Sequence, residues 1–233
     1  MEQIPKSEGK CLFCGETFTK TGITRHLQTH LRQKTKENTP GQSYLVKVEL
    51  NPKWGSSHYF LLLWIDSKAT MKNIDRFLRN IWLECCGHLS AFTTPQSHDK
   101  VPVSRNVDNV FCKGLKLEYK YDFGSTTELL LTVVEEYPVK TDDKIVLLSR
   151  NEPLEWLCDT CKKEPATQIC TVHDWDDDSL FCEKCAEKHA KKCEDFKDYA
   201  AMPVVNSPRM GVCGYEGGTI DIERDGVFTK KQS

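Results

Sequence analysis

The sequence has no long hydrophobic run and no export signal. Its longest apolar stretch, residues 59–65, has the length of a strand, whereas a helix that crosses a bilayer needs about 20 apolar residues. The first ten residues, MEQIPKSEGK, are polar and lack the apolar core of a signal peptide. These absences predict a cytoplasmic protein with no membrane partner.

The sequence also lacks the motifs of several enzyme classes. The glycine-rich segment 211–218, GVCGYEGG, has no Lys-Ser or Lys-Thr pair that would complete a phosphate-binding loop, and no nucleophile elbow is present. No segment indicates a small-molecule substrate. We therefore expect a protein without catalytic residues.

Charge is nearly balanced overall, with a formal net charge of −2, but it is uneven along the chain. Residues 1–40 contain seven Lys and Arg against four Asp and Glu, whereas residues 151–200 contain seven against thirteen. The basic start can meet a phosphate backbone, and the acidic segment cannot do so by charge alone. The two ends therefore suit different partners.

The chain contains twelve cysteines, and eight of them stand in C-x-x-C or C-x-x-H units or at helical spacing from a histidine. In a reducing compartment, thiolates at this spacing are more often metal ligands than disulfides. A disulfide framework is the alternative. A redox C-x-x-C pair is a further alternative, although three neighbouring paired units argue against it.

The first candidate metal site lies in residues 11–30, CLFCGETFTKTGITRHLQTH. Its expected ligands are Cys11, Cys14, His26 and His30. Two thiolates on a hairpin and two imidazoles at i and i+4 on one helix face can surround a Zn²⁺ ion. Phe18 and Ile23 supply the small apolar core that such a segment needs, and twenty residues cannot fold on it without a metal.

This segment resembles the two-Cys-two-His zinc fingers, with one residue fewer between the pairs than the commonest pattern. The family's layout implies that Thr19, Thr21, Gly22 and Arg25 stand near the base-reading positions. We expect Lys20, Arg25 and Arg32 to contact DNA or RNA. The alternative is that these charges only solvate the module.

The second candidate metal site lies in residues 158–193. Its expected ligands are Cys158, Cys161, Cys170, His173, Cys182, Cys185, His189 and Cys193. Eight donors suit two zinc ions, with the first and third pairs sharing one ion and the second pair joining His189 and Cys193 at the other. Cys193 could instead be an ordinary helix cysteine. Both sites have full, sulfur-rich ligand sets, which are typical of structural rather than catalytic zinc.

In ligand order and in its ligand-bearing helix, the second site resembles the cross-braced B-box and MYND-like zinc modules. That resemblance implies a protein partner. The loop at residues 174–178, Asp-Trp-Asp-Asp-Asp, presents an aromatic side chain among negative charges and could contact a basic partner. The alternative is an ordinary solvated loop.

The middle of the chain predicts an antiparallel sheet. Residues 43–50 alternate apolar and polar side chains, 58–65 read as a buried strand, 115–138 as a hairpin and 144–149 as a last strand. Residues 70–86 have a helical apolar stripe with Thr70 as N-cap and Gly87 as terminator. Residues 31–42 read as a linker. The expected fold is α+β: an antiparallel sheet with a covering helix, flanked by two small zinc-stabilised modules.

Residues 43–150 resemble the plasmid pRi open-reading-frame-three-like family, also labelled transposon passenger TnpR-like. The segments that carry the resemblance are YLVKVELN, GHLSAF and LEYKYDFGSTTELLLTVVE, with Tyr-Asp-Phe-Gly at 121–124 the most specific part. The family often has Asp and Trp after that glycine, where this chain has Ser and Thr. The tail NSPRMGVCGYEGG at 206–218 also resembles one on zinc-bearing archaeal members. The family implies an α+β fold and no assigned biochemical role.

Other residues leave alternatives open. His88, Tyr121 and Asp122 could line an enzyme pocket, or Asp122 and Gly124 could simply form a hairpin turn while Tyr121 packs. We expect the remaining cysteines to be buried or free thiols. They are Cys85, Cys86, Cys112 and Cys213.

The leading hypothesis is a non-enzymatic, zinc-binding adaptor. Its finger would contact nucleic acid or a ribonucleoprotein, and its C-terminal module would contact protein. The alternatives are a pure protein-interaction scaffold and an enzyme with a pocket near His88. The expected parts are a finger at 1–36, an α+β domain at 43–150, a binuclear zinc module at 155–200 and a Gly-rich tail at 201–233.

Overall fold

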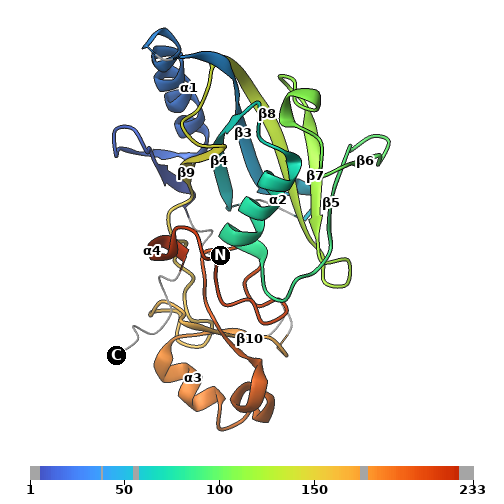
Figure 1. The fold of residues 1–233 in the computed structure, drawn as a ribbon. Helices are drawn as coiled ribbons and strands as arrows, with labels where there is room; N and C mark the ends of the chain where they lie inside the picture. Colours follow the sequence, from blue (N-terminus) through green and yellow to red (C-terminus); the bar gives the residue numbers. More distant parts are fainter. Residues whose placement is uncertain (1–5, 38, 55–57, 174–177, 226–233) are drawn as a thin grey trace. The chain divides into compact units, whose positions relative to one another are not determined.

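The computed structural model describes the chain except for residues 1–5, 38, 55–57, 174–177 and 226–233. The acidic loop predicted as a contact surface lies mostly outside the described residues. The chain forms two compact units (Figure 1). We call residues 6–79 with 88–152 the sheet unit, and residues 80–87 with 153–225 the cysteine-rich unit.

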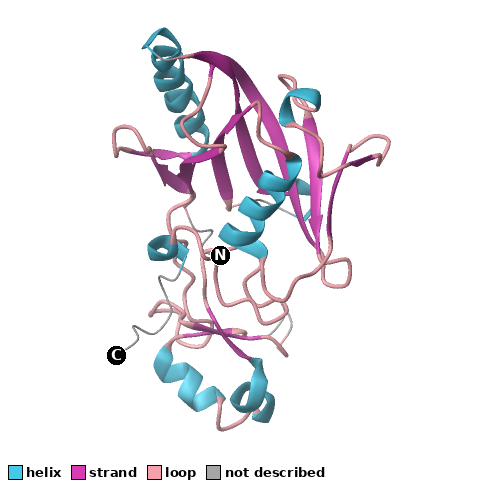
Figure 2. Ribbon diagram, in the orientation of Figure 1, coloured by secondary structure: helices cyan, strands magenta, loops and turns pink. Residues whose placement is uncertain are grey.

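The sheet unit is built on a seven-stranded antiparallel sheet (Figure 2). In spatial order its strands are β6 (Lys100–Val101), β5 (Ser90–Thr93), β7 (Lys116–Tyr121), β8 (Thr127–Val139), β3 (Pro40–Leu50), β4 (Phe60–Asp66) and β9 (Ile145–Arg150). The strands predicted at 43–50, 58–65 and 144–149 and the hairpin within 115–138 are therefore confirmed. Short 3₁₀ turns lie at Pro52–Trp54 and Val107–Asn109. The fold class is α+β.

Strand β4 is buried on both faces, as its continuous apolar sequence predicts. Leu61 and Leu62 are both fully buried although successive side chains point to opposite faces. Leu62 belongs to the core under helix α1 (Lys20–Glu37). Register pairing places Leu61 on the same face as Tyr119, whose hydroxyl donates to Asp75 of helix α2 (Met71–Leu78) at 2.8 Å. The two helices therefore cover opposite faces of the sheet.

Helix α1 is longer than the sequence pattern predicts, and the linker predicted at 31–42 is wrong. The helix continues to Glu37, and β3 begins at Pro40. The reason is packing: Leu27 and Leu31 continue the spacing of Ile23 by four residues each, and all three are fully buried against the sheet. Apolar residues at this spacing form one helix stripe, which the sheet covers.

Helix α2 begins where it is predicted to begin but ends early. Thr70 accepts a hydrogen bond from the backbone N–H of Asn73, and the Asn73 side chain accepts from the backbone N–H of Thr70, which completes a capping box. The regular helix stops at Leu78, and a π-helical turn follows at Arg79–Leu83. The helix predicted to reach Gly87 is therefore too long in its last turns.

Two further elements form the N-terminal hairpin of the sheet unit, β1 (Glu8–Lys10) and β2 (Thr17–Thr19). The cysteine-rich unit has a three-stranded sheet in the order β11 (Leu180–Phe181), β10 (Gln168–Cys170), β12 (Ala201–Pro203). Its helices are α3 (Glu183–His189) and α4 (Ile222–Asp225), with a π-helical turn at Phe196–Ala200. Among the described residues, no helix is long and apolar enough to cross a membrane.

Candidate metal centres

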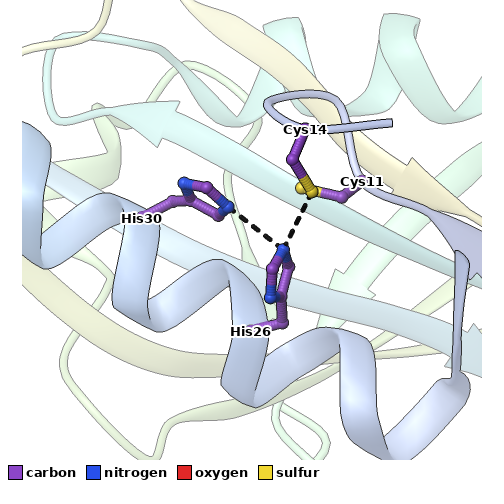
Figure 3. Close-up of side chains that lie close together, drawn as sticks. All are labelled: Cys11, Cys14, His26 and His30. Carbon is purple, nitrogen blue, oxygen red and sulfur yellow. Dashed lines mark hydrogen bonds between the residues drawn. The ribbon is translucent and has the colours of Figure 1, made fainter. Parts of the chain in front are cut away.

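The twelve predicted ligands come together in three groups of four, and within each group the donor atoms all lie within 4.8 Å of one another. The first group is Cys11, Cys14, His26 and His30 (Figure 3). The Cys14 sulfur lies 3.2 Å from Nε2 of His26, and Nε2 of His30 lies 3.0 Å from the same atom. Distances of this size join neighbouring ligands of one small cation.

The local fold explains how these four side chains converge. The cysteines stand on the turn between β1 and β2, where the Gly15 N–H donates to the Cys11 carbonyl at 2.9 Å and Gly15 has φ of 75°. Glycine adopts this left-handed conformation without a steric penalty. The histidines follow at i and i+4 on α1, so their rings leave one face of the helix.

Aromatic packing holds the two imidazoles in place. The Phe18 ring stacks on His26 with centroids 4.1 Å apart, and Phe13 lies 5.2 Å from His30. Burial and the neighbouring His26 lower the pKa of His30, which keeps its ring neutral and able to bind a metal. Burial raises the pKa of the Cys11 thiol, so a cation is needed to hold it as a thiolate.

The three residues predicted to meet nucleic acid differ in their surroundings. Lys20 forms an ion pair with Glu49 of β3, so its ammonium points toward the sheet. Arg25 and Arg32 are exposed on α1, on the side away from Leu27 and Leu31. They belong to an exposed stripe of Thr21, Arg25, Thr29, Arg32 and Lys36.

The second group is Cys158, Cys161, Cys182 and Cys185, which joins the first and third cysteine pairs. The Cys161 and Cys182 sulfurs lie 4.0 Å apart. The Cys158–Cys161 turn repeats the geometry of the finger, because the Lys162 N–H donates to the Cys158 carbonyl at 2.8 Å and Lys162 has φ of 52°. Asp159 ties this turn to β11 by accepting from the backbone N–H groups of Ser179 and Leu180.

Backbone donors and burial act in opposite directions on the thiols of this group. Backbone N–H groups of Glu164 and Lys163 lower the pKa of Cys161 to about 7, because they stabilise the thiolate. Burial, reinforced by Cys182 and Cys158, raises the pKa of Cys185 to about 12. Four thiols at this distance repel one another once ionised, and a divalent cation removes that repulsion.

The third group is Cys170, His173, His189 and Cys193. Its donors come from the end of β10 and the turn after that strand, and from the end of helix α3 and the turn after that helix. The Phe181 ring stacks on His189 at 4.2 Å, and Phe196 meets the same imidazole edge-on at 4.9 Å. Burial and the neighbouring His173 lower the pKa of His189. The second and third groups interleave along the chain, as a cross-braced module does.

A further group of thiols was not predicted from the sequence. Cys85, Cys86 and Cys213 lie close together in the cysteine-rich unit, and Cys86 and Cys213 are exposed rather than buried. A sequence signal exists: Cys86 and Cys213 each precede a glycine, as Cys14 does. Cys112 is also exposed and joins none of these groups in the described chain.

His88, Tyr121 and Asp122 also come together, within the sheet unit. Nε2 of His88 lies 3.4 Å from a carboxylate oxygen of Asp122, and its ring meets Tyr121 edge-on at 5.7 Å. Asp122 has φ of 63°, and its other oxygen accepts from the Gly124 N–H at 3.0 Å. Tyr121 is fully buried. Asp122 therefore forms the hairpin turn, and the same carboxylate faces the imidazole.

Comparison with known proteins adds little to this picture. No family model matches the chain, and no curated protein matches it. A solved structure that matches is a protein of unknown function, MM3350 from Methanosarcina mazei Go1, with 13% sequence identity and a TM-score of 0.41. The match covers 69% of this chain and 87% of that one. The resemblance to the plasmid pRi family stays a prediction.

Proposed function

We propose that the protein is a zinc-stabilised, non-enzymatic adaptor that binds nucleic acid through helix α1 and protein through the cysteine-rich unit. One observation carries the zinc part: twelve Cys and His side chains converge in three groups of four, with no carboxylate among the donors. Four soft or borderline donors favour Zn²⁺ over the harder Mg²⁺ and Ca²⁺.

Structural zinc fits these groups better than catalytic zinc. A hydrolytic zinc site has three protein ligands and keeps one position for water. Each of these groups supplies four protein donors, so the ion would have no position left for a substrate. The ions would then act by joining distant segments, as Cys158 and Cys185 are joined across the module.

Metal analysis tests this part directly. Protein purified without added metal is expected to contain at least three zinc ions per chain by inductively coupled plasma mass spectrometry. Cys11→Ser should remove one ion, and Cys112→Ser, at an exposed thiol outside the groups, should remove none. A folded wild-type protein without zinc would contradict the proposal.

The exposed stripe on α1 supports the nucleic-acid part. Residues 20–36 contain five Lys and Arg and no acidic side chain. Because Leu27 and Leu31 are covered by the sheet, Arg25 and Arg32 stand on a helix face that is open to a partner. Arginines so placed bind phosphates and guanine edges.

Titration of labelled duplex DNA and of single-stranded RNA by fluorescence anisotropy tests this. R25A/R32A should weaken binding and flatten the plot of log affinity against log salt by about two units, since each lost phosphate contact removes about 0.9. K72A/R76A removes the same charge from exposed positions on α2 and should change neither the affinity nor the salt slope. If the wild type binds neither probe at low salt, the protein-interaction scaffold replaces the proposal.

The proposal assigns the protein partner to the cysteine-rich unit because residues 151–200 are acidic and would repel a phosphate backbone. The contact between His88 and Asp122 is the observation that bears on the second alternative, an enzyme. Under the adaptor proposal, His88→Ala leaves binding of nucleic acid and of protein unchanged. Loss of a catalysed turnover in that variant, with zinc content intact, would favour the enzyme.

A further inference from the structure

Three cysteines outside the predicted sites meet in the cysteine-rich unit. Cys85 and Cys86 follow the π-helical turn, and Cys213 lies 127 residues after Cys86. The Cys86 sulfur lies 3.9 Å from that of Cys85 and 3.8 Å from that of Cys213. Segments so distant in sequence bring thiols together only where the fold holds them there.

The distances between these sulfurs fit a shared metal ion. A disulfide would place two sulfurs about 2.05 Å apart. Two thiolates bound to one zinc ion at about 2.3 Å in tetrahedral geometry are about 3.8 Å apart. Cys161 and Cys182, in a predicted site of the same unit, are 4.0 Å apart. The unassigned thiols therefore have the spacing of the assigned ones.

The backbone around these cysteines repeats that of the predicted sites. Cys14 and Cys161 are each followed by a residue with positive φ, Gly15 at 75° and Lys162 at 52°. Cys86 and Cys213 are followed in the same way by Gly87 at 81° and Gly214 at 66°. This conformation turns the chain directly after the sulfur, which leaves the thiol on the outside of a tight bend.

Hydrogen bonds fix the two segments to each other. The Ser207 hydroxyl donates to the Trp82 carbonyl at 2.7 Å, and the backbone N–H groups of Thr219 and Ile220 both donate to the Asn80 carbonyl. Ser207 and Asn80 are parts of the same unit as the thiols. The loop that carries Cys213 is therefore anchored on either side of that residue.

A buried arginine balances the negative charge of the thiol group. Arg209 is fully buried, and its Nη2 donates to the Cys85 sulfur at 3.6 Å. A guanidinium stays charged at every accessible pH, and a hydrogen bond from it favours the thiolate form of its acceptor. Three thiolates with one divalent ion carry a charge of −1, which Arg209 neutralises.

We infer that Cys85, Cys86 and Cys213 form a further zinc site, which ties residues 80–87 to the loop at 206–220. Three thiolates select a soft or borderline ion, and zinc is the one that suits a structural role. The site is independent of the three groups of the proposed function, because it shares no ligand with them.

Alkylation of the native wild-type protein tests the site without a variant that could misfold. Cys86, Cys213 and Cys112 are all exposed, so a maleimide can reach each of these sulfurs unless a metal ion holds it. We expect Cys86 and Cys213 to react at least tenfold more slowly than Cys112, and as slowly as Cys14, until a chelator is added. Mass spectrometry of the digested protein measures the extent of labelling at each cysteine. Labelling at the rate of Cys112, or a disulfide between these cysteines, would overturn the inference.

A count of bound metal separates this inference from the proposed function. Wild-type protein should hold four zinc ions per chain, and Cys213→Ser should hold three, whereas Cys112→Ser keeps four. Three ions in both the wild type and Cys213→Ser would reject this site and leave the other three groups intact. Absence of zinc from the wild type would reject both.

Discussion

At the scale of single residues, Glu49 shows how the sheet unit satisfies a largely buried charge. Its carboxylate pairs with Lys20 at the start of α1 and with Lys47 two residues before it on β3. Burial acts to raise the pKa of Glu49, but the hydrogen bonds and charges of the two lysines outweigh it and lower that pKa below the ordinary value of a glutamate. The ion pair also links the finger helix to the sheet.

This pair predicts a specific dependence of stability on pH. Because the pKa of Glu49 is lower in the folded state, its contribution is complete above the unfolded value and is lost as pH falls through the folded value. Glu49→Gln should therefore reduce the free energy of unfolding at pH 6, and should reduce it by less at pH 3. Urea unfolding at both pH values measures it. Asp142→Asn, at an exposed carboxylate, should show no such difference, and equal losses at both pH values would contradict the assignment.

At the scale of elements, the docking of α1 distinguishes this finger from an independent module. Ile23, Leu27 and Leu31 share one core with Leu62 and Trp64 of β4. The finger hairpin is also attached to the sheet, since the Leu12 N–H donates to the Leu148 carbonyl of β9 at 2.9 Å. The zinc site and the sheet are therefore expected to stabilise α1 together.

Leu27→Ala tests this coupling. Truncating a fully buried leucine typically costs about 2–5 kcal/mol, because apolar contacts are lost and a cavity remains. Thr29→Ala, on the exposed side of the same helix, should change the free energy of unfolding by less than about 0.5 kcal/mol. Urea unfolding followed by circular dichroism gives both values. Similar small losses in the two variants would show that α1 does not depend on the sheet.

The same elements show what the sequence could and could not predict. The strands, the Thr70 cap and the twelve ligands follow from local spacing, which the sequence displays directly. The end of α1 was missed because its polar composition reads as a linker, and only the distant sheet explains why Leu31 is buried. The π-helical turn that ends α2 was also missed, because the carbonyls of Asn80 and Trp82 accept hydrogen bonds from residues 207, 219 and 220, which lie far along the chain. The thiol group at Cys86 and Cys213 was missed because its two segments lie far apart in the chain, and the glycine after each cysteine is the one local sign of it.

At the scale of the whole molecule, the two units have different sources of stability. The sheet unit has a seven-stranded sheet with a helix on each face. The cysteine-rich unit has strands of only two or three residues, and the core around its second and third ligand groups is made largely of the cysteines themselves with Phe181 and Phe196. Without metal, such a core holds too little apolar surface to fold.

A chelator should therefore act unequally on the two units. When zinc is removed, the backbone amides of residues 158–173 and 178–200 are expected to lose their protection from hydrogen exchange. The amides of β3, β4 and β8 should keep theirs. Readdition of zinc should restore the protected state. Uniform loss of protection across both units would contradict this division.

The buried stripe of α1 has a consequence for any attempt to isolate the finger. A peptide cut after residue 37 would carry Leu27 and Leu31 into water, without the sheet that shields them. Such a fragment is expected to bind its ion and then self-associate through the exposed leucines. Its oligomeric state in solution would therefore reflect this apolar helix face and not the finger of the intact chain.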